Sequence, residues 1–304
     1  MKTNHIYQGN VLDRIKDIEE KSVQCVVTSP PYWGLRDYGT AEQLGLEETP
    51  EEYVENMVKV FRGVKKILKD NGTLWLNLGD SYSSGGRTTT TNQTLRGTID
   101  YGVKRPNPSK DIKPKDLIGI PWRVAFALQQ DGWYLRQDII WHKPNPMPES
   151  VTDRCTKSHE YIFLLSKSDK YFYDNDAIKE KAVGERWGGN NPMNVNNSKD
   201  RENIHNGLTR ERSMKFETRN KRSVWSINTK PYKEAHFAVF PSKLPELCIK
   251  AGSREGDIVL DPFFGSGTTG WVAQRLKRKW LGIELNQQYI EIANKRFTQQ
   301  ELFI

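Results

Sequence analysis

The sequence predicts an α/β fold whose sheet is mostly parallel and carries one antiparallel strand at its edge. Apolar runs at residues 23–28, 73–78 and 257–261 have the length of buried strands, and apolar residues at helical spacing lie between them. A turn rich in glycine, residues 265–270, joins the last run to a helix. At 304 residues the chain can form one large domain with a smaller inserted piece.

The other elements follow from local signals. Thr49, Pro50 and Glu52 predict a helix start, because threonine caps, proline fits the first turn and glutamate completes a capping box. Asn71-Gly72 is expected to end this helix. Further helices are expected at residues 11–18, at 117–130 with an interruption at Pro121, at 243–251 and after Asn286. Further strands are expected at 6–7, 133–141 and 279–284, and irregular structure at 143–148. Residues 160–166 and 171–173 are expected to form a hairpin at the sheet edge.

Two long segments lack a hydrophobic period. Residues 81–113 are rich in Ser, Gly, Thr and Arg, which predicts either a loop that contacts DNA or idle disorder. Residues 175–235 are rich in Asn, Gly and alternating charge, which fits either a segment that reads base edges or a solvated insert. The expected organisation is a first half at residues 1–174, an insert at 175–235 and a second half at 236–304.

The composition of the chain indicates which classes of partner it can bind. The formal net charge of +8 favours a polyanion such as double-stranded DNA, although charge also serves plain solubility. Nothing apolar has the length of a membrane span, so no membrane partner is expected. Cys25, Cys155, Cys248 and the five histidines are scattered, so neither a disulfide framework nor a metal site is expected.

The strand at residues 23–28 runs into Ser29-Pro30-Pro31-Tyr32. Open α/β sheets bind ligands at the carboxyl ends of their strands. Proline has no N–H, so the carbonyls of this turn have no neighbouring donor and can accept from an incoming amino group. Ser29 and the Pro30 carbonyl are therefore candidate acceptors and Tyr32 a candidate stacking ring, with a plain turn as the alternative.

The glycine-rich turn is a second candidate site. Gly265-x-Gly267-x-x-Gly270 formally matches the dinucleotide fingerprint, and Glu284 stands about twenty residues further on, where an acceptor for ribose hydroxyls is usual. A nicotinamide oxidoreductase is therefore an alternative. It is disfavoured because few residues follow Glu284, so this unit must join strands that lie upstream in the sequence.

Two motifs resemble those of the β class of S-adenosylmethionine-dependent DNA amino-methyltransferases, whose motif order is circularly permuted. Residues 28–32, Thr-Ser-Pro-Pro-Tyr, resemble motif IV in its N4-cytosine form, and residues 261–269, Asp-Pro-Phe-Phe-Gly-Ser-Gly-Thr-Thr, resemble motif I. Residues 240–242 look like motif X, whereas Gly9-Asn10 departs from the usual Gly-Asp. The resemblance implies a Rossmann-like methyltransferase sheet with an inserted target-recognition region.

The site residues follow from this resemblance and from the basic composition of the insert. Catalysis is assigned to Ser29, Pro30, Pro31 and Tyr32. The residues expected to bind S-adenosylmethionine are Asp261, Phe263, Gly265, Ser266, Gly267, Thr268, Glu284, Phe240, Ser242 and, despite the departure from the family pattern, Asn10. The residues expected to contact DNA are Trp33, Arg36, Arg210, Arg212, Arg219 and Arg222.

The implied reaction is site-specific methyl transfer to the exocyclic N4 amine of cytosine, with adenine N6 as the alternative target, because serine in place of aspartate is the only discriminator. The target base is expected to turn out of the duplex. A non-catalytic DNA-binding protein on the same scaffold is a further alternative. We expect a cytoplasmic protein of bacterial, archaeal or phage origin, monomeric or homodimeric, that acts alone or beside a separate restriction endonuclease.

Overall fold

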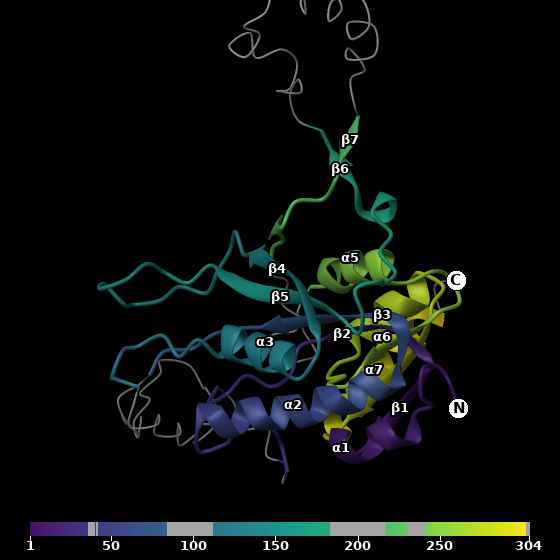
Figure 1. Ribbon diagram of the computed structural model, residues 1–304, viewed down its shortest axis with the longest axis horizontal. Helices are drawn as coiled ribbons and strands as arrows, with labels where there is room; N and C mark the ends of the chain where they lie inside the picture. The colour runs from purple at the N-terminus through teal and green to yellow at the C-terminus, as the bar shows by residue number, and fades with distance from the viewer. Residues whose placement is uncertain (36–39, 41, 84–111, 183–216, 230–240, 302–304) are drawn as a thin grey trace, which may run out of the picture. The chain divides into compact units, whose positions relative to one another are not determined.

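The computed structural model describes residues 1–35, 40, 42–83, 112–182, 217–229 and 241–301, with residues 299–301 described by their backbone alone. The chain divides into two compact units, Met1–Asp174 with Ser223–Ile304, and Asn175–Arg222. The smaller unit contains a 3-10 turn, η2 (Asp176–Ile178), and a two-stranded sheet of β6 (Glu180–Lys181) and β7 (Thr218–Arg219). The larger unit contains an eight-stranded sheet, of which Figure 1 labels β1 to β5.

The large sheet has the strand order β1-β10-β9-β2-β3-β5-β4-β8. All neighbouring strands in it are parallel except β5, which runs antiparallel to both β3 and β4. The strands, in chain order, are β1 (His5–Gln8), β2 (Val23–Thr28), β3 (Leu68–Leu78), β4 (Tyr134–His142), β5 (His159–Ser166), β8 (Val224–Ser226), β9 (Ile258–Asp261) and β10 (Lys279–Glu284).

The antiparallel strand is confirmed, but its expected place at the sheet edge is wrong. Strand β5 lies inside the sheet, and residues 171–173 form no strand, so the predicted edge hairpin is absent from the described chain. The reason is burial. Residues 162–166 are buried, as in a strand with a neighbour on each side, whereas the edge position is taken by the short β8.

Helices cover both faces of the sheet. On one face α1 (Val11–Arg14) and the 3-10 turn η1 (Ile15–Asp17) pack against α2 (Pro50–Ile67), which packs against α3 (Ile120–Gln130). On the other face α5 (Lys243–Gly252) contacts α6 (Thr268–Arg275), and α6 contacts α7 (Gln287–Glu301). Alternate residues of β10 face opposite sides of the sheet. Leu281 belongs to the hydrophobic core that includes side chains of α2, whereas Trp280 stacks on Phe297 of α7.

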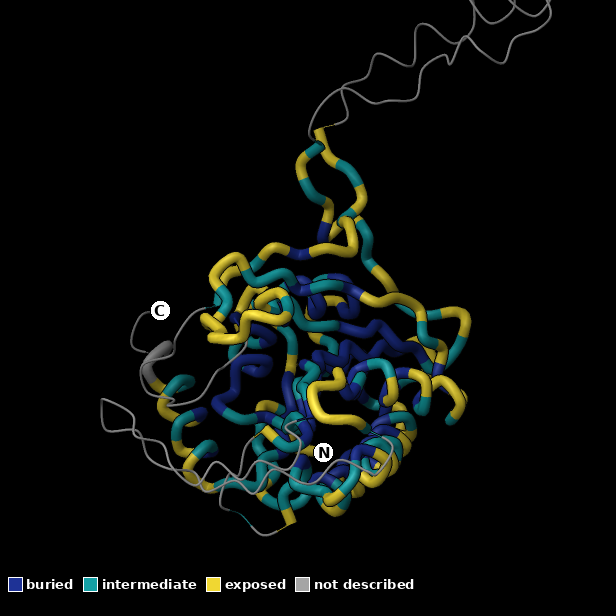
Figure 2. Tube along the Cα trace, turned by 90° about the vertical axis from the view of Figure 1, so that its left-hand side faces the viewer, coloured by how far each residue is buried: buried dark blue, intermediate teal, exposed yellow. Residues whose placement is uncertain are grey.

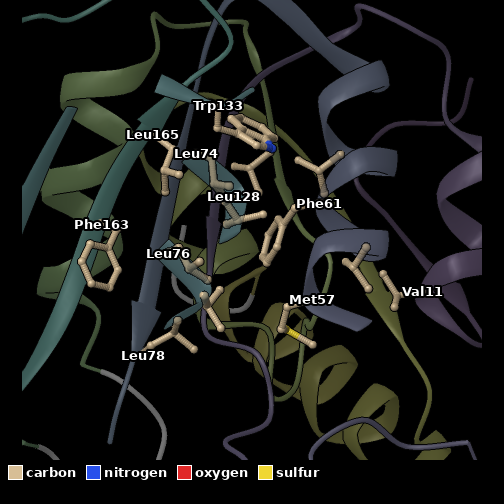
Figure 3. Close-up of a cluster of buried hydrophobic side chains, with 14 of the residues drawn as sticks. Val11, Met57, Phe61, Leu74, Leu76, Leu78, Leu128, Trp133, Phe163 and Leu165 are labelled. Atoms are coloured by element: carbon tan, nitrogen blue, oxygen red, sulfur yellow. The ribbon is translucent and has the colours of Figure 1, made fainter. Parts of the chain in front are cut away.

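The main hydrophobic core lies between the sheet and α1, α2 and α3. Figure 3 shows Met57 and Phe61 of α2 facing side chains of β3 such as Leu76, with Phe163 on the neighbouring β5. Figure 2 shows in dark blue the buried stretches of the chain, which gather in the interior of the larger unit. Because the sheet is closed on both faces, ligands can reach it at the ends of its strands.

Two predicted helix boundaries need comment. The capping box of α2 is present as expected, with Thr49 and Glu52 bonded reciprocally. The helix ends at Ile67 rather than at Asn71-Gly72, because Leu68 is already extended and β3 begins there. Pro121 lies in the first turn of α3 and does not interrupt it.

The expected pairing of late strands with early ones is confirmed. Strand β10 lies between β1 and β9, and β9 is paired in parallel with β2 through Cys25↔Val259 and Val26↔Leu260. The two strands that carry the candidate motifs are therefore neighbours and point the same way. None of the helices within the described ranges is long and apolar enough to cross a bilayer.

Candidate active site

A buried carboxylate joins the tips of β2 and β9. The Thr28 hydroxyl donates to Asp261 Oδ1 at 2.7 Å, and the Phe263 amide donates to the same oxygen at 3.1 Å. The Thr269 hydroxyl donates to Asp261 Oδ2 at 2.8 Å. Asp261 is 1% exposed, so its oxygens face protein groups rather than a ligand. We interpret Asp261 as a residue that positions the two motifs, which corrects its expected direct contact with a cofactor.

Burial dominates the protonation of this carboxyl group. Desolvation raises the pKa of Asp261 to about 7, although the hydrogen bonds from Thr28, Thr269 and Phe263 act in the opposite direction. The hydroxyl of Thr269 also lies 3.3 Å from the Val27 carbonyl oxygen. The tether therefore joins the β2 backbone, the β9 tip and the first turn of α6.

The Pro-Pro turn is held from α2. The Tyr53 hydroxyl, on a fully buried side chain, donates to the Pro31 carbonyl oxygen at 2.8 Å. Within the described ranges the Pro30 carbonyl oxygen accepts no hydrogen bond. One carbonyl of the turn is thus an anchor, whereas the preceding one, on the buried Pro30, keeps its acceptor capacity.

Tyr32 is fixed at its hydroxyl. It donates to Glu160 Oε2 at 2.7 Å, lies 3.4 Å from Asn77 Oδ1 and accepts from the Ser29 hydroxyl at 3.3 Å. Burial raises the pKa of Tyr32 well above its usual value, and the Glu160 carboxylate adds to the rise. A Cβ built on Gly79 would lie 2.5 Å from the Tyr32 ring, so only glycine leaves room for the ring at the end of β3.

Glu160 is the functional candidate that the sequence did not indicate. Its Oε1 pairs with Lys143, and Asn77 Nδ2 donates to its Oε2 at 3.1 Å. The side chains of Lys143 and Glu160 are 19% and 14% exposed, and the Lys143 ammonium lies 4.5 Å from the centre of the Trp141 ring. The one local signal was a charged residue at the start of an otherwise apolar strand.

Trp33 is not available for stacking on DNA. It is 4% exposed, belongs to the hydrophobic core and donates its indole N–H to the Glu47 carbonyl at 2.9 Å. Its predicted contact with a flipped base is therefore wrong. An aromatic residue beside a motif is as readily a core residue as a ligand contact, and burial is not visible in the local pattern.

The glycines of the cofactor motif have two different roles. Phe264 stacks on Trp280 at 5.2 Å between ring centroids, and Phe297 of α7 extends this stack. A Cβ at Gly267 would lie 3.1 Å from Phe264 and from Ala293, and a Cβ at Gly270 would lie 2.6 Å from Phe264. These two glycines therefore make room for an aromatic ring. Gly265 (φ +50°) has only one backbone atom, at 4.0 Å, near the position of such a Cβ.

The surroundings of Gly265 fit a polar nucleoside ligand. Glu284 is half-buried, and its oxygens accept the amides of Gly265 at 2.7 Å and Asn286 at 2.8 Å, which leaves further lone pairs for hydroxyl donors. Burial raises the pKa of Glu284, and these amides act against the rise. The buried Ser266 hydroxyl has no hydrogen-bond partner within the described ranges. An unpaired buried hydroxyl beside an open glycine is what a bound polar group would satisfy.

The remaining predicted cofactor residues differ in position. Thr268 is buried and accepts from Arg296 of α7 at 2.7 Å, and the half-buried Phe263 packs on the core. Asn10 caps α1 through the Leu12 amide at 2.9 Å, next to Gly9, whose amide donates to the Glu284 carbonyl at 2.9 Å. Ser242 is exposed at the start of α5. Phe240 lies outside the described residues.

The predicted DNA-contacting arginines are only partly described. Arg36, Arg210 and Arg212 lie outside the described residues. Arg219 and Arg222 both pair with Glu180 Oε1, at 2.9 and 2.6 Å, and Lys221 pairs with Oε2 at 3.2 Å. Burial opposes ionisation of Glu180, but the hydrogen bonds from Arg222, Lys221 and Arg219 outweigh it and lower the pKa of Glu180 to about 2. Both arginines thus have a carboxylate partner within the smaller unit.

An open α/β sheet with a Pro-Pro-Tyr turn and a glycine-rich turn on adjacent strands defines the class of the protein. A family model described as DNA methylase, N6_N4_Mtase, matches residues 23–295. The chain therefore belongs to the family of N4/N6 DNA methylases.

Named relatives agree with this class. Type II methyltransferase M.SmaI of Serratia marcescens is 49% identical over 300 residues, covering 99% of this chain and 92% of that protein. The PvuII DNA methyltransferase, described as cytosine-N4-specific, matches with a TM-score of 0.65 at 21% identity, covering 98% of this chain and 87% of its own. A DNA modification methylase of Thermus thermophilus, complexed with S-adenosyl-L-methionine, matches with a TM-score of 0.58 at 24% identity, covering 97% of this chain and 94% of that chain. These likenesses confirm the predicted Rossmann-like methyltransferase fold.

The Asp261 tether predicts a pH effect on stability. The unfolded chain releases this proton near the ordinary value of 3.8, whereas the folded protein holds it to about pH 7. Between these values the folded state binds more protons, so the contribution of Asp261 to the free energy of unfolding falls as pH rises. In Asp261→Asn the amide oxygen still accepts from Thr28, and its NH₂ can donate to Thr269. Urea unfolding at several pH values should show that the variant lacks this fall; parallel pH profiles would contradict the assignment.

The two glycine roles predict different effects of two matched substitutions on stability and on cofactor binding. Gly267→Ala adds a Cβ against Phe264 and Ala293 on top of positive-φ strain, so it should lower the free energy of unfolding by about 2 kcal/mol or more. In Gly265→Ala the new Cβ meets open space, so the free energy of unfolding should fall by only about 1 kcal/mol. The affinity for S-adenosylmethionine should fall more in Gly265→Ala than in Gly267→Ala. Urea unfolding and titration calorimetry measure the two effects. Equal loss of stability in both variants would contradict the distinction.

Proposed function

We propose that the protein is a site-specific DNA methyltransferase that transfers a methyl group from S-adenosylmethionine to the N4 amine of cytosine, turned out of double-stranded DNA. The observation that carries this proposal is the Thr28–Asp261 hydrogen bond of 2.7 Å. It holds the turn that begins at Ser29 beside the turn that begins at Pro262, so an acceptor for an amine and a donor of a methyl group can share one site.

The cofactor of this reaction is S-adenosylmethionine, which supplies an electrophilic methyl group on a sulfonium centre when bound. Glu284 would accept from its ribose hydroxyls, because that carboxylate stands at a strand tip with lone pairs to spare. Gly265 would allow close approach of the backbone, and Ser266 would satisfy its buried hydroxyl on the ligand. Phe263, Phe240, Ser242 and Asn10 would be further contacts of the cofactor in this proposal.

The chemistry at the target is set by two acceptors. The lone pair of a nucleobase amine is delocalised into the ring, so the amine is a poor nucleophile. When the Pro30 carbonyl and the Ser29 oxygen accept its two N–H groups, a pyramidal nitrogen with a free lone pair is favoured. The ring of Tyr32 would stack on the base, and positioning would supply much of the rate.

The proposed recognition of DNA rests on the middle of the chain. Residues 175–235 are assigned as the target-recognition region, between a catalytic half at 1–174 and a cofactor-binding half at 236–304. Arg219 and Arg222 would exchange Glu180 for phosphate or base acceptors when DNA binds, since both pairs lie in a polar segment. Arg36, Arg210 and Arg212 are further candidates on the basis of the sequence alone.

Cytosine N4 is preferred over adenine N6 because Ser29 stands at the first position of the motif. Methylation at cytosine C5 would need a thiolate nucleophile, and burial raises the pKa of Cys25 to about 12 and that of Cys248 well above its usual value. Cys155 is exposed and is not preceded by proline. Amine methylation therefore fits these side chains better than thiol-based chemistry.

Nucleoside analysis tests the proposed reaction. Genomic DNA from cells that express the chain should contain N4-methylcytosine after hydrolysis, and mapping of the modified positions should give one recurrent site. DNA from cells that carry the empty vector is the control. N6-methyladenine as the sole product would overturn the choice of base. A second test incubates the purified protein with DNA and S-adenosylmethionine that carries a labelled methyl group. Absence of label on the DNA would favour a non-catalytic DNA-binding protein.

The Pro30 carbonyl predicts a separation of binding from turnover. In Pro30→Ala the backbone gains freedom and an N–H, so the acceptor is no longer held in place. Turnover should fall by about tenfold or more, because the carbonyl contacts the target amine and not the cofactor. Calorimetric affinity for S-adenosylmethionine should be unchanged. A variant with full turnover would show that the acceptor lies elsewhere.

A further inference from the structure

Three side chains form a continuous hydrogen-bonded chain that leaves the Pro-Pro-Tyr turn. The Ser29 hydroxyl donates to Tyr32 Oη at 3.3 Å, and the Tyr32 hydroxyl donates to Glu160 Oε2 at 2.7 Å. The Tyr32 hydroxyl accepts one of these bonds and donates the other, so both protons of the chain point away from Ser29 and toward the carboxylate. The oxygen of Ser29 keeps its lone pairs for a donor on the substrate side.

We infer that Ser29, Tyr32 and Glu160 form a relay that removes the surplus proton of the methylated amine and delivers it to the Glu160 carboxylate. The inference rests on the proposed function, since it needs an amine at Ser29. It adds a proton acceptor that lies outside the motif, 128 positions from Tyr32 in the sequence.

The proton balance is complete within these groups. The amine nitrogen forms a bond to the methyl carbon, and the electron pair of the broken carbon–sulfur bond stays on sulfur. Bond formation alone would leave the nitrogen with one proton and one positive charge too many, so the proton leaves as the carbon–nitrogen bond forms. That proton passes to Ser29 Oγ, the proton of Ser29 passes to Tyr32 Oη, and the proton of Tyr32 passes to Glu160 Oε2. Both hydroxyls are restored, and the carboxylate becomes a neutral acid that later releases its proton to water.

The surroundings of Glu160 suit an acceptor. Lys143 pairs with Oε1, the oxygen that the relay does not use, and compensates the charge of the carboxylate while it is ionised. Asn77 Nδ2 donates to Oε2 at 3.1 Å and to the Tyr161 carbonyl at 3.0 Å, which fixes the side chain. Tyr32 keeps its proton until it receives another, because burial and Glu160 raise its pKa. Tyrosine therefore conducts a proton without acting as a base.

Glu160→Gln separates proton acceptance from positioning. Glutamine keeps an oxygen that can accept from Tyr32, so the ring stays anchored, but it cannot take a proton at neutral pH. We expect kcat to fall about a hundredfold, within the range of general base catalysis. The affinity for S-adenosylmethionine and the fluorescence of 2-aminopurine placed at the mapped target position should not change. A kcat of Glu160→Gln near that of the wild type would overturn the relay and leave the proposed function standing.

Tyr32→Phe interrupts the same chain at its middle while it keeps the ring. If the three residues act as one relay, Glu160→Gln and the double variant Tyr32→Phe/Glu160→Gln should have the same kcat as Tyr32→Phe, because a broken chain cannot be broken twice. Wild-type single-turnover methylation should also show a solvent deuterium isotope effect that all three variants lack. Additive losses, or an unchanged isotope effect, would assign Glu160 a purely structural role.

Asp257→Asn is the matched control. Asp257 is a half-buried carboxylate that pairs with Lys69 at 3.0 Å, as Glu160 pairs with Lys143, but it precedes β9 at the opposite end of the sheet. Its kcat should equal that of the wild type, and a loss like that of Glu160→Gln would attribute the effect to general destabilisation and overturn the relay. Wild-type protein that transfers no methyl group to DNA would instead overturn the proposed function, and the relay with it.

Discussion

The hydrogen bond between Thr28 and Asp261 is the interaction on which the rest of the site depends. It joins residues 233 positions apart, and each is the last residue of its strand. Ser29 follows the first and the glycine-rich turn follows the second, so the geometry of one bond fixes the distance between the two turns. Because Asp261 is buried, loss of either partner would leave a polar group unsatisfied, which makes the arrangement costly to break.

The cofactor turn is supported by packing as much as by glycine flexibility. Phe264 lies between backbone positions that have no side chain, and a Cβ at Gly282 would come within 2.4 Å of its ring. Trp280 and Phe297 close the stack, and Arg296 bonds to Thr268 and to the Ser266 carbonyl. The last helix thus braces the turn from behind. A sequence fingerprint of spaced glycines cannot tell this packing role from close approach to a ligand.

The sequence predicted what depends on local pattern. The capping box at Thr49, the strand that ends at Thr28 and the pairing of late strands with early ones all follow from neighbouring residues and chain connectivity. Long-range burial was not predictable. Trp33 is an aromatic residue of the kind that stacks on bases, and only the packed structure shows that it belongs to the hydrophobic core. Glu160 reaches Tyr32 through pairing of β5 with β3, which no spacing in the sequence encodes.

The reversed direction of β5 explains how Glu160 reaches the site at all. A parallel strand presents its end at the edge where ligands bind, and the residue that follows it enters a loop. An antiparallel strand presents its beginning there. Glu160, second residue of β5, therefore lies opposite Trp141 of β4 and one position from Tyr161, which pairs with Leu78 at the end of β3. A carboxylate held by sheet pairing is more rigid than one on a loop, which is what a proton acceptor at a fixed distance from Tyr32 requires.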